Sequence, residues 1–199
     1  MIRVLHSVSN MDRGGIETML MNYYRHIDRE KVQFDFIVNK QKPGDYDDEI
    51  RRLGGHIYQS PGLDPLHYPA YLRFVQQTVA ADPRSRILHA HNEAMGLYAL
   101  KGAEKAGLQV RIAHAHNIWI VRDYKWPLKM FCKRLLPGAA THLWACGRDA
   151  GIYYFGKADW ERRGQIIPNA IEPETFRFDS AVRAEMRARY GLEDRVVLG

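Results

Sequence analysis

Two observations in the 199-residue sequence predict an α/β fold, with a doubly wound parallel sheet covered by helices on both faces. Short apolar runs alternate along the chain with longer segments in which apolar residues recur every three or four positions. Most of the short runs are apolar at successive residues, which is typical of strands buried on both faces of a parallel sheet. Right-handed crossovers between parallel strands then place helices on both sides.

Seven apolar runs are expected to form the strands of this sheet. Each run is short and is followed by polar or turn-forming residues, such as Ser9 after the first run and Pro168 after the seventh. In chain order, the expected strands cover residues 4–8, 34–38, 57–58, 86–91, 110–116, 141–146 and 165–167. Residues 195–199 look like the beginning of a further strand, which indicates that the chain is the front part of a longer protein.

The segments between these runs carry the helical pattern. In the first of them, Ile16, Leu20 and Tyr23 fall on one side of a helix. Gly54 and Gly107 follow the second and fourth segments, and glycine commonly follows the end of a helix. The expected helices cover residues 16–27, 45–53, 68–81, 95–106, 126–136, 148–155 and 180–190.

The composition excludes several classes of protein. Hydrophobic residues make up 46% of the chain and charged residues 26%, unlike collagen-like, disordered or disulfide-rich chains. Cys132 and Cys146 show no Cys-x-x-Cys spacing, which favours a reduced cytoplasmic location. No apolar run approaches the ~20 residues of a membrane span, and the N-terminus lacks a signal-peptide pattern. The net charge of +6 is compatible with phosphates, anionic lipid or nucleic acid as partners.

Two glycines, Gly14 and Gly15, lie where the first strand passes into the first helix. Glycines at such a junction allow a ligand to approach the backbone, and the free N–H groups of a helix start attract phosphate. The spacing differs from Gly-x-Gly-x-x-Gly, which disfavours a dinucleotide-binding dehydrogenase. A phosphate-binding loop and a plain tight turn both remain open at this point.

The sequence His-Ala-His-Asn occurs twice, at residues 89–92 and 114–117, each time at the end of an expected strand. Residues two apart in a strand point to the same face. If the two strands are neighbours, four imidazoles therefore gather at the edge of the sheet where such folds bind ligands. These histidines could hold a metal, hydrogen-bond a polar ligand such as a sugar, or form a structural network.

A basic and aromatic segment runs from Trp119 to Pro137. It carries five positive side chains and one negative side chain, interleaved with tryptophan, leucine and phenylalanine. Such a segment suits an anionic membrane surface. The more common alternative is a helix that packs on the core and exposes a basic side. No nucleic-acid-binding motif is present, and nucleic acid is not expected as a partner.

Five segments, taken in order, resemble the retaining glycosyltransferases of the GT-B fold, in the large group called glycosyltransferase group 1 or family 4. The resemblance covers essentially the whole chain and is strongest for members that build capsular or exopolysaccharides. The matching segments are 9–17 (SNMDRGGIE), 88–92 (LHAHN), 113–117 (AHAHN), 145–150 (ACGRDA) and 167–176 (IPNAIEPETF).

This resemblance implies two Rossmann-like domains with a cleft between them. Residues 1–178 would be the N-terminal, acceptor-side domain. Residues 179–199 would be a linker helix and the start of a C-terminal nucleotide-sugar-binding domain that the chain lacks. The full-length protein would transfer a sugar from a nucleotide-sugar donor to a glycan or lipid-linked acceptor, with retention and without a metal or other cofactor. The isolated chain is expected to be inactive.

The resemblance also implies roles for individual residues. Gly14 and Gly15 would lie against the donor pyrophosphate, and His116 would be the catalytic residue that contacts the donor sugar. The acceptor side would be bordered by Asn10, Asp12, Arg13, His91 and Arg148. Two alternatives stay open: a GT-B-fold epimerase, and a non-catalytic module that docks on a membrane, at its inner face, or on a protein partner.

Overall fold

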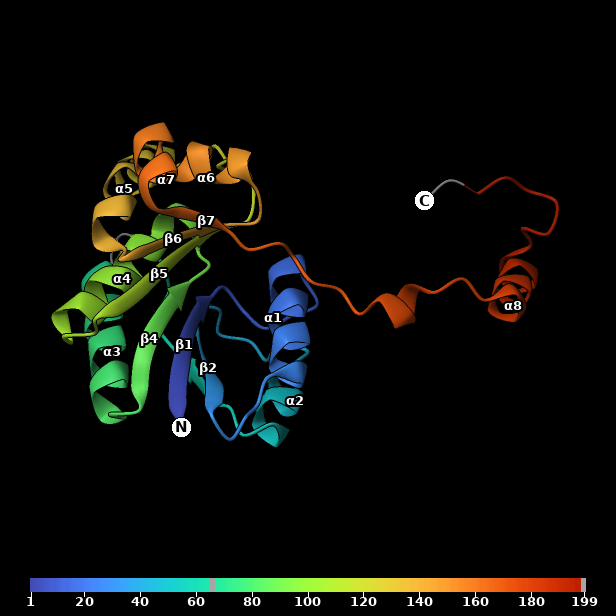
Figure 1. Ribbon diagram of the computed structural model, residues 1–199, viewed down its shortest axis with the longest axis horizontal. Helices are drawn as coiled ribbons and strands as arrows, with labels where there is room; N and C mark the ends of the chain where they lie inside the picture. The colour runs from blue at the N-terminus through green and yellow to red at the C-terminus, as the bar shows by residue number, and fades with distance from the viewer. Residues whose placement is uncertain (65–66, 198–199) are drawn as a thin grey trace.

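The computed structural model describes residues 1–64 and 67–197 and contains one seven-stranded sheet with the strand order β3-β2-β1-β4-β5-β6-β7 (Figure 1). Every pair of neighbouring strands in this sheet is parallel, which confirms the predicted Rossmann-like, doubly wound class. The strands are β1 (Ile2–Val8), β2 (Val32–Val38), β3 (Ile57–Gln59), β4 (Ser85–Ala90), β5 (Val110–Ala115), β6 (His142–Ala145) and β7 (Gly164–Ile166). The strand order reverses between β1 and β4, and ligands of such sheets bind at this switch point, beyond the carboxyl ends of the strands.

The helices agree with the predicted segments, apart from one addition. They are α1 (Gly15–His26), α2 (Asp47–Arg52), α3 (Tyr68–Ala81), α4 (Gly96–Lys105), α5 (Trp126–Ala139), α6 (Arg148–Phe155), α7 (Lys157–Arg163) and α8 (Ser180–Tyr190), with 3-10 turns at Glu93–Met95 and Pro173–Phe176. The sequence did not predict α7, because this short helix buries only Trp160 among polar neighbours. The indole lies against Gly151 and Gly164, where any side chain would collide with it.

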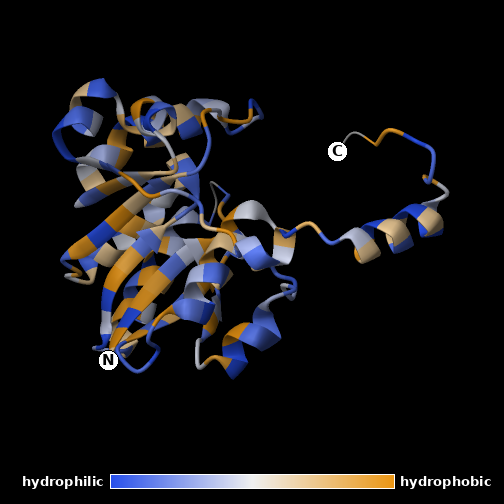
Figure 2. Cartoon of the chain, turned by 45° about the vertical axis from the view of Figure 1, so that its right-hand side comes forward, coloured by the Kyte–Doolittle hydropathy of each residue, from blue (hydrophilic) through white to orange (hydrophobic). Residues whose placement is uncertain are grey.

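Two apolar clusters hold the layers together. On one face of the sheet, α1 and α2 pack on β2 through residues that include Leu20, Tyr24 and Phe36. On the other face, α3, α4 and α5 pack on the central strands through residues that include Val75 and Leu100. Figure 2 shows the strands as the most hydrophobic part of the chain, as expected for a sheet covered on both sides.

A buried ion pair joins β1 and β2 within the apolar interior. The Arg3 guanidinium lies 2.7 Å from the Asp35 carboxylate, and both side chains are buried. Asp35 also accepts hydrogen bonds from the backbone N–H of His56 at 2.8 Å and lies 3.0 Å from Nδ1 of the same residue. The carboxylate is therefore held by β1 and by the residue that precedes β3.

The chain beyond β7 crosses to α1 and then leaves the body of the fold (Figure 1). The Tyr23 hydroxyl donates to the carbonyl of Pro168 at 3.0 Å, and the Asn22 amide donates to the carbonyl of Ala170 at 3.1 Å. α8 follows at a distance, and none of its residues is buried.

The expectation of a strand from residue 195 is wrong for residues 195–197. These residues pair with no strand, and Val196 is 91% exposed. The last two residues of the expected strand, 198 and 199, lie outside the described part of the chain. Within that part, no helix is long and apolar enough to cross a membrane.

Candidate functional site

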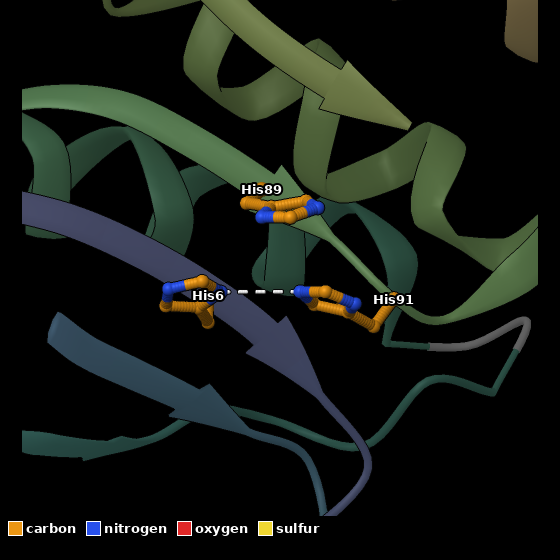
Figure 3. Close-up of side chains that lie close together, drawn as sticks. All are labelled: His6, His89 and His91. Atoms are coloured by element: carbon orange, nitrogen blue, oxygen red, sulfur yellow. Dashed lines mark hydrogen bonds between the residues drawn. The ribbon is translucent and has the colours of Figure 1, made fainter. Parts of the chain in front are cut away.

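Five histidines gather on the α1 side of the sheet, near the carboxyl ends of three neighbouring strands. The two predicted doublets lie side by side because β4 pairs directly with β5. His6 of β1 joins them, because β1 pairs with the other side of β4 and places His6 opposite His89. Figure 3 shows His6, His89 and His91 facing one another across these strands. The expectation that four imidazoles would meet at this edge is confirmed.

The imidazoles form two hydrogen-bonded groups. In the first, Nδ1 of His6 lies 3.1 Å from Nε2 of His91, and Nδ1 of His91 lies 2.8 Å from Nε2 of His116. In the second, Nε2 of His89 lies 3.1 Å from Nδ1 of His114, with the two rings nearly parallel. Each ring therefore has at least one nitrogen directed at another imidazole.

Burial keeps this cluster uncharged at neutral pH. Desolvation lowers the pKa of His6 and of His114 to about 3, and that of His116 to about 4. Desolvation also lowers the pKa of His89 and of His91 well below the usual value, and the neighbouring imidazoles lower them further. Neutral imidazoles can both donate and accept a hydrogen bond.

Neutral imidazoles are also the form that binds transition metals. Two trios, His6-His89-His91 and His91-His114-His116, have ring nitrogens within 4.8 Å of one another. Either trio could therefore supply three ligands, but only if the hydrogen bonds between the rings were given up. The prediction of a site without a metal stays a prediction.

The glycine pair begins α1 at the same edge of the sheet. Gly14 is the N-cap residue and Gly15 the first helical residue, and no side chain caps the helix. A Cβ at Gly14 would collide with the Glu17 carboxylate, whereas a Cβ at Gly15 would meet no atom within 4 Å. The N–H groups of this helix start lie at the end where an anion is favoured, and the half-buried Glu17 carboxylate lies at the same end.

Three residues predicted for the acceptor side lie in the loop between β1 and α1. The buried Asn10 side chain donates to the Asp12 carboxylate at 2.9 Å, and Lys42 forms an ion pair with the same carboxylate at 2.8 Å. Both contacts lower the pKa of Asp12, with Lys42 as the larger cause. Arg13 is exposed in the same loop.

The fourth acceptor-side residue, Arg148, begins α6. It lies 3.7 Å from Glu161 in an exposed ion pair. Arg148 and His116 line one open hollow of about 380 Å³, together with Trp119, Cys146 and Gly147 among others. The structure therefore brings Arg148 and His116 to one concave surface.

The fifth acceptor-side residue, His91, does not lie on that surface. It is buried, and both of its ring nitrogens are used by His6 and His116. His91 is placed to support His116 from within the fold.

The backbone conformation of Glu93 and the presence of His6 at this edge were not predicted from the sequence. Glu93 follows the first doublet with φ of +51°, the only positive φ of a non-glycine residue among those described. Its carboxylate accepts a hydrogen bond from the side chain of Asn117, which follows the second doublet. His6 was also missed, because a single histidine in an apolar strand carries no pattern until the strand order is known.

An apolar groove of about 290 Å³ lies beside α1 on this face of the sheet. Its walls come from α1 and from outward-facing residues of the strands, and three of the five histidines line it. The lining residues include Met19, Tyr23, Ile112 and Trp144, and the histidines are His6, His89 and His114.

The segment 119–137 packs on the core and also exposes large apolar side chains, and its membrane role stays a prediction. α5 packs on the core through Cys132 and Leu136, as expected of a core helix. Its other side and the preceding loop nevertheless expose large apolar side chains, among them Trp119 at 63% and Phe131 at 58%. Arg122 stacks over the ring of Trp126 nearby.

Three comparisons place the chain among known proteins. A family model described as Glycosyltransferase Family 4 matches residues 13–175. The EpsF protein of Bacillus subtilis (strain 168), named as a glycosyltransferase, is 36% identical over 202 residues, covering 99% of this chain and 53% of EpsF. The GDP-mannose-dependent alpha-(1-6)-phosphatidylinositol monomannoside mannosyltransferase of Mycolicibacterium smegmatis is 25% identical over 204 residues, covering 94% of this chain and 48% of that protein.

Among solved structures, Anabaena HepE in complex with UDP and glucose superimposes with a TM-score of 0.68 at 13% identity. The match covers 96% of this chain and 51% of HepE, and it shows a shared fold. The chain spans about half the length of the curated relatives that it matches.

Proposed function

The chain belongs to glycosyltransferase family 4, and on that premise we propose that it supplies one half of an enzyme that transfers a sugar from a nucleotide-sugar donor. The acceptor is a glycan or a lipid-linked glycan of surface polysaccharide biosynthesis, and the transfer proceeds with retention. The observation that carries this proposal is the sheet edge itself, where an uncapped helix start and a neutral histidine cluster meet.

The donor is assigned to this edge by the chemistry of its groups. The N–H groups at the start of α1 suit the pyrophosphate, and the bare backbone at Gly15 leaves room for its approach. His116 is neutral and lies on the hollow that it shares with Arg148, so its imidazole suits a sugar hydroxyl. The donor base is left open, because one relative is named for GDP-mannose and one structural neighbour was solved with UDP.

The acceptor is assigned to the other polar residues of the edge. Asn10, Asp12 and Arg13 lie in the loop before α1, and Arg148 lies at the start of α6. For His91 we propose a positioning role in place of direct contact, because both of its nitrogens are already bonded. No metal is required in this scheme, since the pyrophosphate charge is met by the N–H groups at the start of α1.

The lengths of the relatives, about twice that of this chain, support the proposed division into domains. Residues 1–178 are assigned to the acceptor-side domain, and residues 179–199 to a linker helix and the start of a nucleotide-sugar-binding domain. The detached α8, which buries none of its residues, agrees with a helix that packs elsewhere in a longer protein. We call this chain followed by such a second domain the two-domain protein.

The segment 119–137 is assigned to an anionic membrane surface, on the cytoplasmic side, where a lipid-linked acceptor would be met. Exposed Trp119 and Phe131 supply apolar contact, and the nearby Arg122 and Arg134 supply charge. Two of the five basic side chains contribute less than their number suggests. Lys129 is paired with Asp123 at 2.8 Å, and the Lys133 ammonium lies 3.7 Å from the centre of the Tyr153 ring.

The test is release of nucleoside diphosphate from a panel of UDP- and GDP-sugars, with a bacterial lipid extract as the source of acceptor. The two-domain protein is expected to release nucleotide from one donor and to label the lipid fraction. Conversion of a nucleotide sugar into its epimer, without release, would establish an epimerase instead. Steady turnover by residues 1–199 alone would overturn the division into domains.

A further inference from the structure

After β5 the chain forms a short loop, residues 117–119, which is one wall of the hollow that His116 lines. We propose that Glu93 is a positioning residue for this loop. Its carboxylate holds Asn117, which in turn fixes Trp119 as a surface against which the acceptor packs. The part played by the acceptor rests on the proposed function, whereas the fixing of the loop is a property of this chain alone.

The loop depends on side chains for its position. Within the described part of the chain, no backbone–backbone hydrogen bond reaches residues 117–119. Ile118 and Trp119 are 60% and 63% exposed, so packing against the core holds them only weakly. The remaining restraints are hydrogen bonds made by the side chains of Asn117 and of Tyr154 in α6, and these bonds decide where the wall of the hollow lies.

The Asn117 side chain is the centre of this hydrogen-bond network. Its amide nitrogen donates to the Glu93 carboxylate, and its amide oxygen accepts from the backbone N–H of Trp119 at 3.1 Å. The Tyr154 hydroxyl donates to the Trp119 carbonyl at 2.8 Å and lies 3.1 Å from the amide oxygen of Asn117. These groups fit only one orientation of the amide, with its nitrogen toward the carboxylate. Glu93 therefore orients the amide, and the amide fixes the backbone of Trp119.

Glu93 makes this contact from an unfavourable backbone conformation. Its φ of +51° lies in the left-handed region, which glycine adopts freely but which is costly for a residue with a Cβ. Such strain is found mainly at sites where a side chain has a function. A hydrogen bond to an ionised carboxylate is stronger than one between neutral groups, so the bond to Asn117 gives a reason for glutamate at this position.

The wall formed by the loop belongs to the acceptor side of the hollow. Arg148 lines the same hollow, and Trp119 is also the first residue of the segment 119–137 assigned to the membrane surface. An acceptor that comes from a lipid surface would reach the hollow past the exposed side chains of Ile118 and Trp119. An indole offers a large and rigid apolar contact area, but only when its backbone is held in place.

The first experiment measures the mobility of the loop by ¹⁵N relaxation in residues 1–199, without any measurement of activity. Glu93→Gly removes the carboxylate and relieves the backbone strain. The order parameters of Ile118 and Trp119 are expected to fall from about 0.85, typical of a rigid backbone, to below roughly 0.6. Glu93→Gln is expected to keep the loop rigid, because its amide oxygen can still accept from Asn117. A loop that stays rigid in a folded Glu93→Gly protein, or that is already mobile in the wild type, would overturn the inference.

Three further variants test the path from the carboxylate to the loop. Glu30→Gly is the matched control, because it removes an exposed glutamate from the turn before β2 and is expected to leave the loop rigid. Tyr154→Phe removes the hydroxyl that holds the Trp119 carbonyl and is expected to loosen the same residues. Asn117→Ala should loosen them as Glu93→Gly does, and the double variant should add nothing, because both changes break one bond. An additive effect of the two changes would contradict a shared path.

The second experiment measures sugar transfer by the two-domain protein at varied concentrations of the lipid extract. Glu93→Gly is expected to raise the apparent KM for the lipid acceptor by about tenfold with little change in kcat, because the wall binds the acceptor and takes no part in bond breaking. Glu93→Gln is expected to keep the wild-type KM. An unchanged KM in a Glu93→Gly protein with a mobile loop would contradict the part played by the acceptor. If the loop behaves as expected but the wild-type two-domain protein transfers no sugar, the fixing of the loop stands and the proposed function fails.

Discussion

A substitution at Gly15 is the simplest test of the proposed donor site. Its backbone does not have a positive φ, and a Cβ there meets no protein atom within 4 Å. A larger side chain is therefore compatible with the fold but fills the space that a pyrophosphate needs. Gly15→Val in the two-domain protein is expected to lower kcat/KM by roughly 10²-fold, because a displaced donor is no longer aligned for reaction.

The control for this substitution is Gly138→Val, which also places a side chain in open space on a helix, away from the sheet edge. It is expected to leave the kinetics unchanged. Equal kinetics for wild type and a folded Gly15→Val protein would show that the glycine pair only forms a tight turn.

Asp35 is the residue whose loss should damage the fold most directly. Removing its carboxylate leaves the buried Arg3 charge without its nearest counter-charge and leaves the His56 N–H without an acceptor. Breaking a buried pair at one partner costs about 3–5 kcal/mol, and Asp35→Ala is expected to lower the free energy of unfolding by about that amount. Urea unfolding monitored by circular dichroism measures it.

Asp48→Ala is the comparison for this stability change. Asp48 is paired with Arg51 at 3.0 Å, but its side chain is 95% exposed, and exposed pairs contribute little. Equal losses of stability in the two variants would mean that the Arg3–Asp35 pair is hydrated and does not act as a buried pair.

At the scale of single elements, α5 and the loop before it form the surface assigned to the membrane. Residues 1–199 are expected to co-sediment with vesicles containing phosphatidylglycerol, and less so as salt screens the charges. Each basic residue near such a surface contributes ~1 kcal/mol, so replacing Arg122 and Arg134 by alanine should weaken binding by more than tenfold.

The same pair of changes at Arg73 and Arg86, two exposed arginines outside this segment, controls for net charge alone. It is expected to weaken vesicle binding much less. Equal binding to phosphatidylcholine and phosphatidylglycerol vesicles, or an equal effect of both double variants, would identify α5 as a core helix without a membrane role.

Elements with a strong repeating pattern were predictable from the sequence, and elements fixed by tertiary contacts were not. The seven strands follow from apolar runs, and α8 from its helical spacing together with Gly191, which ends it with φ of +62°. α7 has no such repeat. Its position is set by Trp160, which packs against Gly151 and Gly164. Residues 195–197 form no strand, because no other strand lies beside them to supply hydrogen-bond partners.

The candidate site was predictable to a similar extent. The two doublets predicted an imidazole cluster because residues two apart in a strand point to the same face, and the local sequence is enough to show this. The contribution of His6 depends on β1 lying next to β4, which only the strand order reveals. The positive φ at Glu93 was equally hidden, since it comes from the turn that leads into α4.

For the molecule as a whole, the buried histidines make stability dependent on pH. Their folded-state pKa values lie far below the ordinary 6.5, at about 3 for His6 and about 4 for His116. Between those values and 6.5 the unfolded chain binds more protons than the folded chain. The free energy of unfolding is therefore fully retained above pH 6.5 and falls as the pH decreases, by up to ~1.4 kcal/mol per pH unit for each imidazole.

When the losses from all five imidazoles are added, a fall of one or two pH units lowers the free energy of unfolding by about as much as the whole stability of an ordinary domain. Residues 1–199 are expected to unfold cooperatively in mild acid, well above the pH at which carboxylates become protonated. Urea unfolding at pH 7.5, 6.5 and 5.5 measures the trend, and replacing the exposed His142 by glutamine should leave it unchanged. A free energy of unfolding that is constant across this range would mean that the cluster is hydrated or already charged.

We propose that the sheet edge is a donor site in which His116 contacts the sugar. A contact that strengthens as the bond between sugar and phosphate breaks affects turnover more than donor affinity. The most direct test is steady-state sugar transfer by the two-domain protein and by its His116→Ala variant, with the donor concentration varied. We expect kcat to fall by about 10²-fold, with a much smaller change in KM for the donor. An unchanged kcat in a folded His116→Ala protein would contradict it.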